Sequence, residues 1–301
     1  KRKVMLNGSN TIAAISTAPG AGGIGVVRIS GPLALDIGQK ISGAILLPRV
    51  ANFHNFKNLN GTLIDQGLIL FFSAPHSFTG EDIIELQCHG GTVVTQSILN
   101  FCLKNGAKLA EPGDFTKRAY LNNKIDLAQA ESVADLINAS TEEAALGAVN
   151  SLSGKFSIEI NNLLKNLIEL RMYVEACLDF PEEDIDFISE GNVKNKLLHL
   201  SETMMRIMQS AVQGQLLRDG ISLVLVGQPN VGKSSLLNQL SGEDKAIVTN
   251  IPGTTRDAIT SDINLNGIPL NIIDTAGLRE TDDPIEKFGI EKTWSSLEKG
   301  H

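Results

Sequence analysis

The sequence has few cysteines, few aromatic residues and no long apolar run. Its three cysteines, Cys88, Cys102 and Cys177, are an odd number without a C-x-x-C pair. This argues against a disulfide framework or a zinc site and favours reduced thiols. No apolar stretch approaches the length that spans a bilayer, and no secretory signal precedes the first elements. We therefore expect a cytoplasmic protein without membrane contact.

Excess positive charge is also absent. The formal net charge of the 301 residues is −8, which disfavours a generally basic nucleic-acid binder but leaves room for a local basic face. Hydrophobic residues make up 42% of the chain, enough for two or three domains with cores of their own.

One stretch carries the clearest chemistry. Residues 227–234, Gly-Gln-Pro-Asn-Val-Gly-Lys-Ser, fit the phosphate-binding pattern G-x-x-x-x-G-K-[ST] without a mismatch. The apolar, β-branched residues 221–226 precede it as a buried strand would, and residues 235–240 follow as an amphipathic helix. In this context, backbone N–H groups surround phosphate oxygens, Lys233 reaches the outer phosphates and the Ser234 hydroxyl holds Mg²⁺.

Two later segments favour a GTPase-type switch. Asp274, at the end of an apolar strand, is placed to hold the Mg²⁺ shell through water, and the Gly277 N–H to contact the γ-phosphate. Upstream, Thr255 is placed to complete Mg²⁺ coordination from a switch loop. Leu278 stands where many small GTPases have a water-orienting Gln, so another group must orient water or hydrolysis is slow. The candidates, each more simply a solvated residue, are Glu280 and Glu286, with Arg256 and Arg279 as charge stabilisers.

The first 120 residues mix strands and helices and predict a compact α+β domain. Residues 61–72 are interpreted as a hairpin, and Asn105-Gly106 is expected to end a helix at 92–103. The other expected elements are strands at 11–17, 24–30 and 82–88 and a helix at 33–41.

Helical periodicity begins near residue 124. Asp126 and Gln129 approximate a capping box before a helix at 127–139, and Thr141 begins another. Longer helices are expected at 156–178, ended by Pro181, and at 193–216, which together predict a helical bundle. We interpret Met204, Met205 and Met208 as core-filling residues, and the acidic loop 181–186 as a solvated turn, with a metal site as the less favoured alternative.

Strand–helix alternation returns at residue 221 and stops early. After strands within 262–273 there is one expected helix, 284–297, whereas a complete nucleotide domain needs about twice as many residues. We expect a chain truncated within this domain, lacking its guanine-recognition motif, and expect residues 221–273 to be disordered or misfolded in isolation. The predicted domains are 1–121 (α+β), 122–218 (α-helical, first half) and 219–301 (partial α/β P-loop domain).

These motifs resemble the MnmE (TrmE) family of tRNA-modification GTPases. Residues 227–238, 251–257 and 274–279 are shared in part with Era/Der-type GTPases. The discriminating motifs, similar to the MnmE family alone, lie at 22–31, 77–82, 85–91, 118–131 and 173–181. The resemblance runs from about residue 10 onward and does not include residues 1–9.

The resemblance implies an N-terminal folate-binding and dimerisation domain, a helical domain and an inserted GTPase domain. Such proteins act as homodimers with a flavoprotein, MnmG, to install a 5-carboxymethylaminomethyl-type group on the wobble uridine of tRNA. The one-carbon donor is 5-formyltetrahydrofolate or a related tetrahydrofolate. By motif position, Arg28, Glu85 and Lys124 contact the folate.

The resemblance also implies potassium-dependent GTP hydrolysis when two G domains dimerise. Glu286 matches the residue that orients water, and Lys233 and Thr255 complete the catalytic set. The matching potassium ligands are Asn230, Thr249, Ile251 and Thr254, and those for Mg²⁺ are Ser234 and Thr255. Contacts to GTP or GDP are expected from Asn230, Val231, Gly232, Lys233, Ser234, Ser235, Thr249, Thr254, Thr255, Asp274, Thr275, Ala276 and Gly277.

Two alternatives remain open at this point. The chain is a non-enzymatic folate-binding dimerisation module if the expected truncation inactivates its nucleotide domain. It is an Era/Der-like ribosome-assembly GTPase if the switch motifs alone define it, although the first 120 residues and the acidic composition disfavour that.

Overall fold

The computed structural model describes residues 10–179, 192–225, 260–265 and 267–274. It divides into two compact units, 1–130 and 131–301. Among the described residues, no helix combines the length and apolar character needed to cross a membrane. The expectations for residues 1–9, the loop at 181–186 and most of the nucleotide domain fall outside the described part. The domain boundaries at 121/122 and 218/219 stay predictions.

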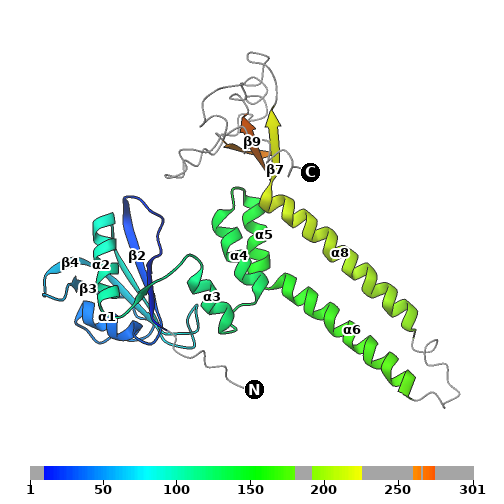
Figure 1. Cartoon of the computed structure of the whole chain (residues 1–301), viewed down its shortest axis with the longest axis horizontal. Coiled ribbons are helices and arrows are strands. Elements are labelled where there is room, and N and C mark those ends of the chain that lie inside the picture. The colour runs from blue at the N-terminus through cyan, green and yellow to red at the C-terminus, as the bar shows by residue number, and fades with distance from the viewer. Residues whose placement is uncertain (1–9, 180–191, 226–259, 266, 275–301) are drawn as a thin grey trace, which may run out of the picture. The chain divides into compact units, whose positions relative to one another are not determined.

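A six-stranded sheet forms the centre of the first unit, in the order β3-β4-β5-β2-β1-β6. Neighbouring strands are antiparallel, except that β1 and β6 run parallel. The strands are β1 (Ile12–Ile15), β2 (Gly22–Ser30), β3 (Asn52–Lys57), β4 (Leu63–Phe72), β5 (Ile83–Gly90) and β6 (Lys108–Leu109). This α+β architecture confirms the expected class (Figure 1).

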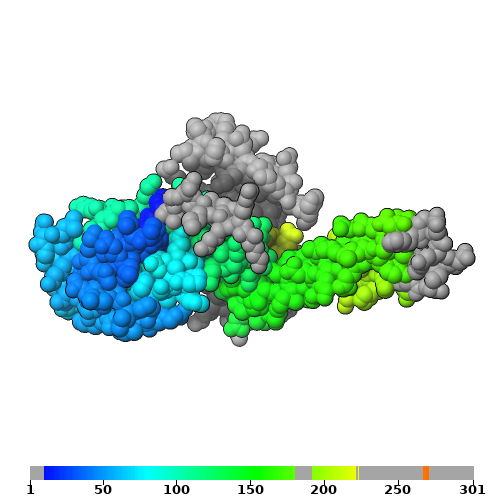
Figure 2. Space-filling view, turned by 90° about the horizontal axis from the view of Figure 1, so that it is seen from below, coloured from blue at the N-terminus to red at the C-terminus, as the bar shows by residue number. Residues whose placement is uncertain are grey.

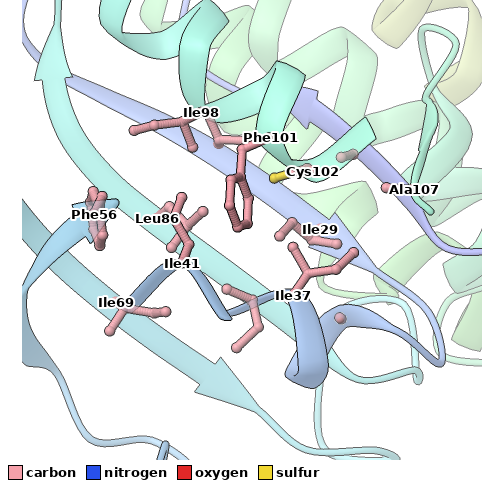
Figure 3. Packing of buried hydrophobic residues seen from close by; sticks show 14 of the residues in the cluster. Ile29, Ile37, Ile41, Phe56, Ile69, Leu86, Ile98, Phe101, Cys102 and Ala107 are labelled. Carbon is pink, nitrogen blue, oxygen red and sulfur yellow. The ribbon is translucent and has the colours of Figure 1, made fainter. Parts of the chain in front are cut away.

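Two helices pack against one face of this sheet and enclose the core. They are α1 (Ala34–Ser42) and α2 (Thr92–Lys104), which ends at Asn105 as predicted. Ile37 and Ile41 of α1 meet Ile98 and Phe101 of α2 over the inward side chains of the strands, Ile29 among them (Figure 3). Since side chains alternate along a strand, the residues between these inward positions lie on the opposite face of the sheet. Arg28 and Glu85 are two of them.

A glycine allows β4 and β5 to approach closely. A Cβ atom added at Gly67 would lie 1.9 Å from the backbone oxygen of Gln87 and 2.9 Å from the Phe56 ring. Phe56 itself is fully buried. The position therefore requires a residue without a side chain.

Residues 61–72 are not a hairpin, contrary to the sequence-based interpretation. Residues 63–72 form the single strand β4, whose hairpin partner is β3, a strand that the sequence did not predict. The turn between β3 and β4 falls at residues 58–62, where Asn58 Oδ1 accepts hydrogen bonds from the backbone N–H groups of Asn60 and Thr62. The helix α3 (Asp114–Leu121) was also missed. It is only eight residues long, and Ala119 is its one buried residue.

The two cysteines of the first unit, Cys88 and Cys102, are buried. Burial, aided by the negative charge of Asp65, raises the pKa of Cys88 to about 11, and burial raises the pKa of Cys102 to about 12. Cys177, on the long helix α6 (Lys155–Asp179), is partly exposed. All three cysteines are free, as expected from their number.

We predict that iodoacetamide at pH 8 alkylates Cys177 first in the folded chain, and Cys88 and Cys102 only on unfolding. Because the two buried thiols ionise at higher pH in the folded state, the unfolded state loses protons first as pH rises above about 8.5. The free energy of unfolding should therefore fall between that pH and the folded pKa values of about 11 and 12. Mass spectrometry of alkylated peptides, with Cys177→Ser as control, measures the rate of alkylation at each cysteine. Equal rates at Cys102 and Cys177 would contradict it.

The helices after residue 126 begin where the sequence predicts. α4 (Leu127–Asn138) starts with a reciprocal capping box: the Asp126 N–H donates to Gln129 Oε1 at 3.0 Å, and the Gln129 N–H donates to Asp126 Oδ1 at 2.9 Å. Thr141 is the N-cap of α5 (Glu142–Leu152), where its hydroxyl accepts from the Ala144 N–H at 3.1 Å. Both predicted helix starts are confirmed.

The methionines of the long helix α8 (Val193–Asp219) are not core residues in the described part. Met204, Met205 and Met208 are 54%, 54% and 59% exposed. α6 and α8 lie side by side (Figures 1 and 2), but among their described residues only Leu170 and Leu200 are buried. Apolar spacing predicted the helices correctly, whereas the burial of an apolar face also depends on partners in space.

A small sheet follows α8 in the second unit. β7 (Ile221–Leu225) pairs in parallel with β9 (Ile268–Asp274), which pairs antiparallel with β8 (Thr260–Leu265). Gly267, in the turn between β8 and β9, accepts a hydrogen bond from the Thr141 hydroxyl at 3.1 Å. The same hydroxyl thus caps α5 and holds the turn. The predicted strand before the phosphate loop is confirmed for Ile221–Leu225.

Candidate functional site

The ion pair between Arg28 and Glu85 lies on the sheet face opposite α1 and α2. The residues stand directly across from each other on the antiparallel strands β2 and β5, so their side chains share one face. Arg28 Nη2 lies 2.7 Å from Glu85 Oε1, and Nε donates to the same oxygen at 2.9 Å. The side chains are 30% and 18% exposed, which leaves both within reach of a ligand.

Two aromatic rings flank the Arg28 guanidinium. Its Cζ atom lies 5.7 Å from the centre of the Phe115 ring, on α3, and 6.0 Å from that of Phe78. Cation–π attraction at this range adds to the charge pairing and restricts the guanidinium plane. Arg28 is therefore held by a carboxylate and by two rings from separate segments.

Lys124 borders the same loop, residues 73–82, that supplies Phe78. Its Nζ donates to the Pro75 backbone oxygen at 2.9 Å, and its methylenes lie against Gly80. Gly80 has a φ of +76°, and a Cβ atom added there would lie 3.2 Å from Lys124 Cγ. The Ala74–Pro75 peptide in this loop is cis. The three residues predicted for folate are thus linked: Arg28 and Glu85 directly, and Lys124 through the loop.

The sequence-based analysis did not predict Phe78, Glu81, Phe115 or Arg118 as parts of this site. Phe78 and Glu81 belong to the Ser-Phe-Thr-Gly-Glu-Asp motif at 77–82, and Arg118 opens the motif at 118–131. In the sequence these motifs indicate only the resemblance, whereas the contact of Phe78 with Arg28 and that of Arg118 with Glu81 emerge only from the fold.

The residues predicted to bind nucleotide, Mg²⁺ and potassium lie outside the described part of the chain, with one exception. Asp274 is the last residue of β9, where its backbone stands across from Leu225 of β7. β7 thus ends immediately before the phosphate-loop segment, and parallel β9 ends at the same edge of the sheet. The remaining nucleotide-site residues stay predictions.

Two family models match the chain with little gap between them. One, described as the GTP-binding protein TrmE N-terminus, covers residues 11–124, and the other, the MnmE helical domain, covers residues 127–298. The second match alone includes more than half of the chain. The chain belongs to the MnmE (TrmE) family.

MnmE proteins from several bacteria are similar over nearly the whole chain. Proteins named tRNA modification GTPase MnmE from Hydrogenovibrio crunogenus, Chromobacterium violaceum and Dechloromonas aromatica are 53%, 56% and 58% identical over 291, 290 and 291 residues. The alignments include 97%, 96% and 97% of this chain and 64%, 64% and 65% of those MnmE proteins. The chain therefore spans just under two thirds of the length of its MnmE relatives.

Proposed function

We propose that the protein represented by this chain is a GTPase that modifies the wobble uridine of tRNA in the cytoplasm. The observation that carries the proposal is identity above 50% with proteins named tRNA modification GTPase MnmE. The similarity includes the N-terminal 11–124 region, so it disfavours the Era/Der-like ribosome-assembly alternative, which rested on switch motifs alone.

The N-terminal unit is proposed to bind 5-formyltetrahydrofolate or a related tetrahydrofolate. The donor set fits such a molecule: Arg28 and Lys124 offer cationic N–H donors for its oxygen acceptors, and Glu85 offers a carboxylate for the amino and ring N–H donors of its pterin. The planar Phe78 and Phe115 rings suit a flat heterocycle. The folate supplies a one-carbon unit, while these residues bind and orient it.

The nucleotide segment is proposed to hydrolyse GTP with residues identified from the sequence motifs and the family resemblance. Lys233 and the phosphate-loop N–H groups bind the phosphates, Ser234 and Thr255 hold Mg²⁺, and Glu286 orients the attacking water. Potassium is proposed to bind Asn230, Thr249, Ile251 and Thr254. The cations supply positive charge for the developing negative charge on the phosphates.

The proposed partners follow from the same family membership. They are a second copy of the protein, the flavoprotein MnmG and the substrate tRNA. Dimerisation explains why Leu278 is tolerated where other GTPases place Gln, because a cation and a second G domain then compensate for the missing side chain.

The test of the GTPase proposal is hydrolysis by the full-length protein in KCl and in NaCl at equal ionic strength. We expect at least about tenfold faster turnover in KCl, of the size that one transition-state charge contact contributes. Equal rates in the two salts would overturn the potassium mechanism. Turnover by the 301-residue chain itself would exclude the alternative of a non-enzymatic folate-binding module.

A further inference from the structure

Arg118 joins three segments that are distant in sequence. From α3, its Nη1 donates to Glu81 Oε2 at 2.7 Å, and its Nη2 donates to the backbone oxygen and Oδ1 of Asn10 at 2.7 and 2.9 Å. The side chains of Arg118 and Glu81 are only 15% and 17% exposed. The pair is thus partly shielded from water, and removing one partner leaves a charge in a partly buried place.

The Glu81 carboxylate also joins the loop 73–82 to the end of β2. The Ser30 hydroxyl donates to Glu81 Oε2 at 2.8 Å and lies 2.8 Å from Thr79 Oγ1. Since Ser30 has one hydroxyl proton, Thr79 is the donor in the second bond. Ser30 and Thr79 are both fully buried. The network therefore gives the loop one defined position against the sheet.

This network lies beside the proposed folate residues. Ser30 is two positions after Arg28 on β2, so both side chains occupy the same face of the sheet. Phe115 precedes Arg118 by three residues on α3, which places both side chains on one side of that helix. One turn of α3 thus supplies both the ring against Arg28 and the guanidinium that fixes the helix.

The segment after α3 is held to the same loop. Asn122 Nδ2 donates to the Thr79 backbone oxygen at 2.7 Å, and the Lys124 N–H donates to the Ala119 oxygen at 2.9 Å. Together with the bond from Lys124 Nζ to Pro75, these contacts connect the position of Lys124 to the position of α3.

We propose that Arg118 is a positioning residue for the folate site. By fixing α3 and the loop 73–82, it sets the places of Phe115, Phe78 and Lys124 around the Arg28–Glu85 pair. This inference rests on the proposed folate binding. The planar guanidinium donates to Glu81 and Asn10 from two nitrogens at fixed angles, which the single ammonium of lysine does not reproduce.

The experiment compares Arg118→Gln, Arg118→Lys and, as matched control, Lys117→Gln in the 301-residue chain. Lys117 is the exposed neighbour of Arg118 on α3, so its substitution also removes one positive charge from that helix. Each variant is titrated calorimetrically with 5-formyltetrahydrofolate, and amide hydrogen exchange is measured in residues 73–82 and 122–125.

We expect Arg118→Gln to weaken folate affinity about tenfold or more, the equivalent of one lost charged hydrogen bond. Exchange should accelerate in both segments and stay unchanged at core amides such as that of Leu86. Arg118→Lys should give an intermediate affinity, and Lys117→Gln should match the wild type. If Arg118→Gln fails to fold, Arg118→Lys provides the comparison.

Two results overturn the inference: wild-type affinity in the Arg118 variants, or weakened affinity with unchanged exchange, which would make Arg118 a direct ligand contact. If the wild-type chain binds no folate, the proposed folate function fails instead. Exchange in the two segments then decides the role of Arg118 separately, with acceleration supporting the positioning role and no change refuting it.

Discussion

Gly67→Ala is expected to lower the free energy of unfolding of the first unit by at least about 3 kcal/mol. The new methyl group would start 1.9 Å from the Gln87 backbone oxygen, a distance that no side-chain rotation relieves. Relief requires that β4 move away from β5. The fully buried Phe56 ring, 2.9 Å from the same point, would also have to shift.

Gly23→Ala is the matched control for this substitution. Gly23 also lies within a strand, β2, but no atom approaches within 4 Å of the place that a methyl group would take there. We expect a change within about 0.5 kcal/mol at this position, as for surface positions in general. Protection of the Ile29 and Leu86 backbone amides from hydrogen exchange reports the stability of the first unit separately from that of the helical second unit. Similar losses in the two variants would show that the close approach at Gly67 is not the cause.

Arg28→Ala is expected to reduce affinity for 5-formyltetrahydrofolate at least about a hundredfold, which corresponds to about 2.7 kcal/mol. The substitution removes a cationic donor and the group that lies against Phe78 and Phe115. It also deprives Glu85, 18% exposed, of its charge partner, so the carboxylate has no fixed orientation toward a ligand. Calorimetric titration of the 301-residue chain measures the effect.

Lys40→Ala serves as control because it breaks a different ion pair in the same unit. Lys40 and Asp36 are one helical turn apart on α1 and are 51% and 54% exposed, so their pair contributes little to stability. Folate affinity should not change. If Arg28→Ala bound folate with wild-type affinity, the assignment of the site to Arg28 would be wrong, and the chain would have to bind folate elsewhere.

The sequence predicted local structure best where the signal was local. The caps at Asp126 and Thr141 use residues three positions apart, and both were confirmed by the hydrogen bonds. β3 escaped prediction because Phe53 and Phe56 are three residues apart and face opposite sides, one 64% exposed and the other buried. A spacing of three residues is that of one helix face and breaks the period of two that indicates a strand. The exposed Met208 shows the converse, a regular apolar pattern without the partner that burial requires.

The candidate site was predictable in its residue types but not in its contacts. Arg28, Glu85 and Lys124 came from motif resemblance alone. The register that pairs Arg28 with Glu85 joins two strands between which the chain forms α1, β3 and β4. Phe115 reaches Arg28 from α3, a helix that Arg118 holds in place. Such convergence depends on long-range packing, which no window of sequence contains.

The hydrogen bonds between Arg118 and Asn10 bring together the two ends of the first unit, as does the parallel pairing of β1 with β6. A fold whose ends meet is suited to circular permutation. A short linker across these ends, with new termini opened in the exposed turn at residues 58–62, should leave the order of strands in the sheet intact. The position at which the chain of this domain begins can thus be changed, whereas the contacts of Arg118 that hold its two ends together must be kept.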